Sequence, residues 1–209
     1  VLTNFGGTMS DIVTLAHELG HGYHDFMIFD NRPLNTRYSM PVAETASTFN
    51  ENLVVNYAIK HAANDEEKLA LLEGQLSDVT QIICDIYSRF LFESKVVNNR
   101  SENFMFADEL CSIMLDAQKE AYGDGLDHDV LHPYMWVCKG HYYSAGLGFY
   151  NFPYAFGGLF ARGLYAKFQQ EGAAFLEKYN YMLKETPVRS VEDVAKICDI
   201  DLTSKDFWL

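Results

Sequence analysis

The sequence is poor in basic residues and contains no lysine- or arginine-rich run. Its 209 residues include 16 Lys and Arg against 29 Asp and Glu, which gives a formal net charge of −13. A surface of that sign repels the phosphates of nucleic acids and the headgroups of anionic lipids. The composition therefore argues against a nucleic-acid or anionic-membrane partner, and it indicates no particular oligomeric state.

Cysteine is scarce and shows no pairing pattern. The four cysteines are widely separated and form no C-x-x-C motif: Cys84, Cys111, Cys138 and Cys198. Disulfide frameworks and zinc–thiolate sites are recognised by closer, regular cysteine spacings. We therefore expect reduced, buried thiols in a cytoplasmic protein.

A long apolar run of the membrane-spanning kind is also missing. Residues 142–161 carry no charge, but they include four glycines, four tyrosines and a proline, with two leucines and no isoleucine or valine. Spanning helices are rich in Leu, Ile and Val. We therefore do not expect this stretch to lie in a bilayer.

The sequence lacks an initiator methionine, since it opens on Val1, and it stops at SKDFWL inside an apolar segment. A chain of 209 residues suffices for one domain with a sizeable core. We expect residues 1–209 to form a single domain that is truncated at both ends.

What the sequence does contain is helical periodicity, because apolar residues recur three and four positions apart. We predict helices at about 10–29, 41–63, 65–97 (one long helix or a broken pair), 102–122, 149–169, 172–184 and a short one opened by Pro187 and Ser190. VLTNF at 1–5 predicts a short strand, and 128–148 predicts a loop with at most a short hairpin. The fold class is therefore mainly α.

The first predicted helix contains the motif H-E-L-G-H at residues 17–21. His17 and His21 are four residues apart, so both imidazoles project from one helix face and can share a zinc ion at about 2.0–2.1 Å. Glu18 lies beside them, where it can take a proton from a metal-bound water. His24 lies about 10.5 Å along the helix axis from His17, so we expect it to neighbour the site rather than to bind the metal. The alternative is an amphipathic helix whose histidines face solvent or core.

A third ligand must come from outside this helix. The longer pattern with a third histidine is excluded, because Tyr23 and Met27 occupy the positions of its glycine and histidine. Glu44 stands in the first turn of the next predicted helix and is followed by small residues that let two helices approach closely. We predict Glu44 as the third ligand; stabilisation of the helix dipole is the alternative. Glu51 is either a hydrogen-bond acceptor for a ligand histidine or a solvated or structural residue.

These residues resemble the oligoendopeptidase F and thimet oligopeptidase family of zinc metallopeptidases, and the oligoendopeptidase F branch in particular. The resemblance covers nearly the whole chain and rests on four segments in the family's order: NFGGTMSDIVTLAHELGHGYH, VAETASTFNEN, HYYSAGLGFYNFPYAFGGLFARGLYA and DIDLTSKDFW. It implies a zincin-like, mostly helical catalytic domain that binds one Zn²⁺ and hydrolyses short peptides by attack of a zinc-bound water. It also implies that an N-terminal helical portion is absent, so activity of the chain alone is not implied.

The resemblance places further catalytic residues in the aromatic segment, 141–166, where a histidine and tyrosines of the family face the zinc. His141 matches that histidine. Among the tyrosines we favour Tyr154, then Tyr150 and Tyr143, as donors to the oxyanion; packing in the core is the alternative for each. Two other functions stay open, a zinc-binding but non-catalytic helical domain and a metal-free scaffold that binds a partner through this segment.

Overall fold

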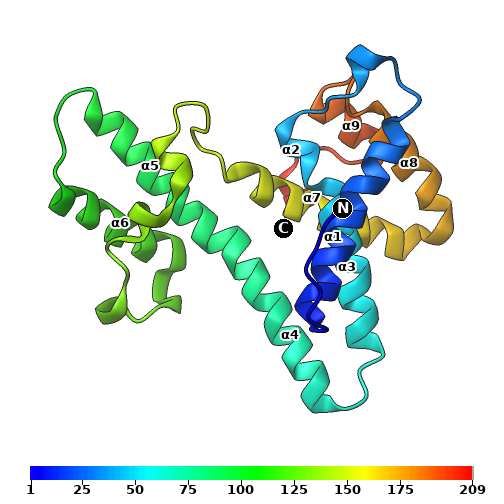
Figure 1. Cartoon of the computed structure of the whole chain (residues 1–209), viewed down its shortest axis with the longest axis horizontal. Helices are drawn as coiled ribbons and strands as arrows, with labels where there is room; N and C mark the ends of the chain where they lie inside the picture. The colour runs from blue at the N-terminus through cyan, green and yellow to red at the C-terminus, as the bar shows by residue number, and fades with distance from the viewer. Residues whose placement is uncertain (209) are drawn as a thin grey trace. The chain divides into compact units, whose positions relative to one another are not determined.

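The computed structural model describes residues 1–208 and confirms the mainly α prediction (Figure 1). Its α-helices are α1 (Met9–Ile28), α2 (Met40–Ala43), α3 (Thr45–Lys60), α4 (Asp65–Thr80), α5 (Ile86–Arg100), α6 (Ala107–Tyr122), α7 (Phe152–Glu171), α8 (Phe175–Glu185), α9 (Val191–Ile197) and α10 (Lys205–Trp208). Short 3₁₀ helices connect several of them. None of the helices in residues 1–208 is both long and apolar enough to cross a membrane.

The chain divides into two compact units. The first contains Val1–Glu73 and the chain from Phe156 onward, and the second contains Gly74–Ala155. The division falls inside α4 and α7. The single domain expected over residues 1–209 stays a prediction.

The core of the first unit forms where α3, α7, α8 and α9 meet. Phe49 of α3 is buried there and stacks on Tyr179 of α8, with 4.5 Å between the ring centroids. Fully buried side chains of α7 and α8 surround this pair: Phe160, Leu164, Phe175, Met182 and Leu183. The face of α3 that carries Glu51 is thereby fixed, with Glu44 at the N-cap of the helix. Helix α1 packs alongside α3 (Figure 1).

Helix α1 begins with a capping box. The Thr8 hydroxyl accepts the backbone N–H of Asp11 at 3.2 Å, and the Asp11 carboxylate accepts the backbone N–H of Thr8 at 2.9 Å. This reciprocal pair satisfies backbone donors that a helix start leaves free. It places the start of α1 within one residue of the prediction.

The predicted helix at 41–63 is broken at Glu44, which lies between α2 and α3. Glu44 has φ −90° and ψ 4°, and it is the N-cap residue of α3. The Ser47 hydroxyl donates to the Glu44 carbonyl at 3.0 Å, and side-chain bonds of this kind compete with regular helical ones. The third predicted ligand therefore stands at a helix junction.

The predicted strand at residues 1–5 is wrong. These residues have no regular structure, and Leu2 is 99% exposed. A strand needs a neighbour to accept its backbone hydrogen bonds, and residues 1–208 offer no other strand. The region 128–148 likewise forms no hairpin and folds into short 3₁₀ helices: His128–Val130, Met135–Cys138 and Gly140–Tyr143.

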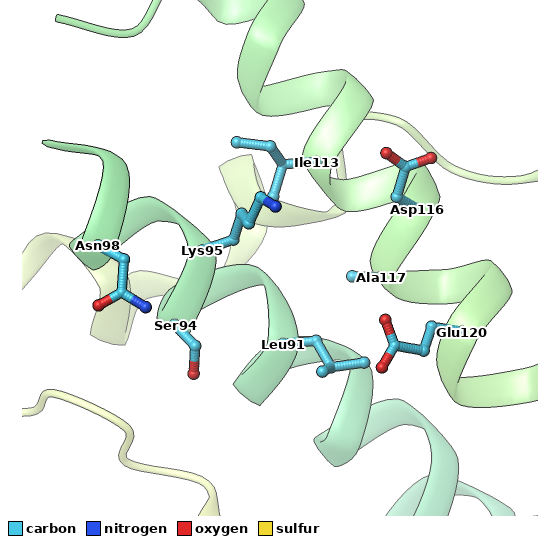
Figure 2. A pocket seen from close by; sticks show the side chains of 8 residues that line it. All are labelled: Leu91, Ser94, Lys95, Asn98, Ile113, Asp116, Ala117 and Glu120. Carbon is cyan, nitrogen blue, oxygen red and sulfur yellow. The ribbon is translucent and has the colours of Figure 1, made fainter. Parts of the chain in front are cut away.

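In the second unit, α5 packs against α6. The predicted broken pair at 65–97 appears as α4 and α5 with a π-helical turn between them at Gln81–Asp85. A groove with a volume of about 270 Å³ lies between α5 and α6. Figure 2 shows the apolar side chains of Leu91, Ile113 and Ala117 that line it alongside charged ones. The charged side chains at this groove are Lys95, Asp116 and Glu120.

Candidate active site

Three predicted ligands come together in the first unit. His17 and His21 project from α1 toward Glu44 at the α2–α3 junction. The two histidine Nε2 atoms are 3.1 Å apart, and they lie 3.4 Å and 3.5 Å from Oε2 of Glu44. Within the part of the chain that the structure describes, this is the one cluster of His, Cys, Asp or Glu side chains suited to a metal ion.

Nε2 of His17, Nε2 of His21 and Oε2 of Glu44 form a triangle, here called the metal triangle, whose size fits one tetrahedral ion. Bonds of 2.0–2.1 Å to such an ion hold neighbouring ligand atoms about 3.3 Å apart, which is close to all three observed distances. The side chains of His17, His21 and Glu44 are 25%, 29% and 14% exposed, so solvent can reach the cluster. Two imidazoles and one carboxylate form a donor set that suits catalytic zinc.

A glycine inside the motif allows α1 to approach α3. A Cβ atom on Gly20 would lie 2.5 Å from the carbonyl oxygen of Ala46 and 2.5 Å from Cα of Ser47. Both are backbone atoms, so no side-chain rotation could relieve the overlap. The close contact therefore needs the small residues Ala46 and Ser47, which the sequence analysis considered, and also Gly20, which it did not. The available signal was a glycine in a helix interior.

Two more residues hold Glu44 in place. The Ser47 hydroxyl, which already bonds the Glu44 carbonyl, also lies 3.1 Å from its Oε2 atom. Gly157 of α7 packs against the other side, where an added Cβ would lie 2.8 Å from Cβ of Glu44. Neither contact could be predicted, because each depends on which segments meet in the folded chain.

Glu51 approaches the same site from α3. Its Oε1 atom forms a short hydrogen bond with Nδ1 of His17, and this bond, opposed by partial burial, raises the pKa of His17. Of the two roles considered for Glu51, the structure favours that of a hydrogen-bond partner of a candidate ligand histidine over that of a solvated residue. The Glu18 carboxylate, in contrast, is half-buried on α1 and has no hydrogen-bond or ion-pair partner among residues 1–208.

His24 lies outside the triangle. It is fully buried, stacks on Tyr38 with 4.0 Å between ring centroids, and places its Nε2 atom 2.8 Å from the Thr186 hydroxyl. That hydroxyl donates to the Leu183 carbonyl, so His24 is the donor and its Nδ1 atom carries no proton. Burial lowers the pKa of His24 to about 4.

The buried neutral His24 predicts a pH-dependent stability. An unfolded histidine takes up a proton below about pH 6.5, whereas folded His24 does so only near pH 4. Protons therefore favour the unfolded chain in this window, and we expect His24 to lower the free energy of unfolding by roughly 3 kcal/mol as the pH falls through it. Urea unfolding of the metal-free chain at several pH values should show a steeper dependence for the wild type than for His24→Phe. Equal slopes would contradict the assignment.

The four predicted residues of the aromatic segment lie in the second unit. The rings of His141 and Tyr150 are 6.1 Å apart, and the hydroxyls of Tyr150 and Tyr154 are 3.3 Å apart. Tyr143 is 64% exposed and points its hydroxyl at the Trp136 carbonyl, 3.4 Å away. The structure thus brings His141, Tyr150 and Tyr154 close to one another, whereas the Tyr143 hydroxyl faces a backbone carbonyl instead. Their roles toward a metal stay predictions.

Helix α5 anchors this segment through residues that sequence reasoning missed. A Glu93 carboxylate oxygen accepts the backbone N–H of Phe149 at 2.8 Å, and Arg89 donates to the Asn151 side chain at 3.1 Å. Phe149 has φ 55°, a left-handed conformation that costs energy for a bulky side chain. Burial also lowers the pKa of His141, which favours a neutral ring.

The chain is similar to proteins described as oligopeptidases and oligoendopeptidases. The chain is 27% identical to oligopeptidase PepF of Bacillus subtilis over 208 residues, which is 99% of the chain and 31% of that protein. It is 28% identical to an oligoendopeptidase F homolog of Lactococcus lactis over 210 residues, which is 99% of the chain and 34% of that protein. The chain therefore spans about a third of the length of these relatives.

Solved structures share the fold. A crystal structure from Chlamydophila abortus matches with a TM-score of 0.83 and 26% identity, over 98% of this chain and 34% of that one. Oligoendopeptidase-F from Enterococcus faecium matches with a TM-score of 0.74 and 22% identity, over 95% of this chain and 36% of that one. The profile described as peptidase family M3 matches residues 1–209. Because that match covers the whole sequence, the chain belongs to peptidase family M3.

Proposed function

We propose that this polypeptide is a zinc-dependent endopeptidase that hydrolyses short peptides. The observation that carries the proposal is the triangle of His17, His21 and Glu44, whose edges of 3.1–3.5 Å suit one tetrahedral ion. The chemistry that zinc supplies when bound is Lewis acidity, which acidifies a water molecule and polarises the scissile carbonyl.

The chain's own groups carry out the proton transfers. Glu18 accepts the proton of the attacking water and later delivers it to the leaving amine. Its carboxylate suits this role because it forms no hydrogen bond or ion pair among residues 1–208 and lies near enough to His17 to interact with it electrostatically.

The aromatic segment is proposed to supply donors to the oxyanion, as preorganised hydrogen bonds do in acyl transfer. His141, Tyr150 and Tyr154 are the first candidates because they lie together. Tyr143 ranks after them, since its hydroxyl already faces the Trp136 carbonyl.

Short peptides are the proposed substrates because relatives are described as an oligopeptidase and an oligoendopeptidase. The net charge of −13 argues against nucleic acids and anionic membranes as partners. All four cysteines are free thiols, which supports the proposed cytoplasmic location, but the expectation that they are buried holds only for Cys198, and Cys138 is exposed.

Glu18→Gln tests the proposed chemistry. The amide keeps the shape of the side chain but cannot accept the water proton, so we expect kcat/KM for a fluorogenic peptide to fall at least about 100-fold, with zinc content unchanged. The assay uses the polypeptide at its natural length, and Glu66→Gln, an exposed substitution on α4, is the matched control. Full turnover by zinc-loaded Glu18→Gln would remove Glu18 from its role. A zinc-loaded wild type without peptidase activity would favour the non-catalytic zinc domain.

A further inference from the structure

His17 is held between two carboxylates. Its Nε2 atom lies 3.4 Å from Oε2 of Glu44, on the side of the metal triangle. Its Nδ1 atom forms the short hydrogen bond with Oε1 of Glu51. Each nitrogen of this imidazole therefore has its own acidic partner.

The two carboxylates come from α3 and the residue before it. Glu44 is the N-cap residue of α3, and Glu51 follows it by seven residues, which is nearly two full helical turns. The burial of Phe49 fixes the opposite face of α3 in the core, so Glu44 and Glu51 both face α1. The contact of Gly20 with the α3 backbone brings His17 within reach of them.

We propose that Glu51 is a positioning residue for the metal site, which accepts the Nδ1–H of His17 and thereby directs the Nε2 lone pair of His17 toward the ion. The inference rests on the proposed zinc site. A carboxylate in this position fixes the tautomer and the ring orientation of a ligand histidine and raises its basicity. Glu51 is 29% exposed, so its place is not explained by core packing.

His21 provides a comparison within the same site. Its Nε2 atom faces the triangle as that of His17 does, but its Nδ1 atom has no hydrogen-bond partner in the described residues, 1–208. Nothing in that part of the chain selects a tautomer for His21. The two ligand histidines therefore differ, and only His17 is oriented by a second carboxylate.

Zinc affinity of the purified chain tests the proposal, measured by competition with a chromophoric chelator. Glu51→Ala should weaken zinc binding about 10- to 100-fold while leaving one zinc per chain at saturation. Glu51→Gln should restore part of the affinity, since its amide oxygen can still accept the hydrogen bond. Glu73→Ala, an exposed substitution on α4, should leave the affinity unchanged.

A second measurement reports the hydrogen bond without metal. The ¹⁵N shifts of labelled histidines in the zinc-free chain, recorded at alkaline pH where the His17 ring is neutral, should show His17 as the Nδ1–H tautomer, and Glu51→Ala should convert it to a mixture. A wild type that binds zinc, with Glu51→Ala binding it equally tightly, overturns the role of Glu51 and leaves the proposed function standing. A wild type that binds no zinc overturns both. A mixed His17 tautomer in the wild type overturns the role of Glu51 alone.

Discussion

Glu44→Ala leaves the chain folded but without tightly bound zinc. Removing one of the three proposed ligands should lower zinc affinity at least about 100-fold, because even the loss of a residue that only orients a ligand has effects of 10- to 100-fold. The fold itself should persist. Glu44 stands at a helix junction, outside the apolar core of the first unit.

Metal content per chain, by elemental analysis after dialysis, checks this result. The wild type should hold about one zinc and Glu44→Ala almost none, while the control Glu73→Ala keeps the wild-type content. Circular dichroism and urea unfolding of the zinc-free proteins should be similar for wild type and variant. Stoichiometric zinc in Glu44→Ala would remove Glu44 from the ligand set and favour the alternative role, stabilisation of the helix dipole.

Gly20→Val should disrupt both the site and the fold of the first unit. The first added carbon would lie 2.5 Å from backbone atoms of Ala46 and Ser47, and two further methyl groups need still more space. Helices α1 and α3 would have to separate, and overpacking of this kind typically costs about 1–3 kcal/mol or more. Separation would also widen the metal triangle, so zinc affinity should fall together with stability.

Gly22, two residues further along α1, provides a matched control for Gly20. Gly22 lies on the same helix, and a Cβ there would meet nothing within 4 Å. Alanine favours helix over glycine by about 1 kcal/mol, so Gly22→Ala should raise the free energy of unfolding. Gly20→Ala should lower it despite the same gain in propensity. Equal effects of the two alanine variants in urea unfolding would contradict the backbone contact.

The candidate ligands could be predicted from the sequence because their arrangement is largely local. A spacing of four residues puts His17 and His21 on one face of a helix whatever surrounds it. Glu44 required one further assumption, that the next helix packs against the first. The structure brings the three side chains within reach of one ion, and their ligation of zinc stays a prediction.

The parts of the site that escaped prediction depend on tertiary contacts. The packing of Gly157 on Glu44 joins residues that are far apart in the sequence. The contact of Phe149 with Glu93 joins a loop to a helix that precedes it by more than fifty residues. The strand expected at VLTNF failed for a related reason, because five residues of suitable composition form a strand only beside a partner.

The close contact at Gly20 also bears on how sequences of this fold can change over time. Any side chain at this position requires the backbone of α3 to move, so we expect substitutions of Gly20 to be selected against. In an alignment of such chains, that column should vary as little as the columns of His17 and His21. Such invariance would reflect the short distance between α1 and α3. A search for catalytic residues based on invariance alone would therefore select Gly20, which has no side chain that could take part in a reaction.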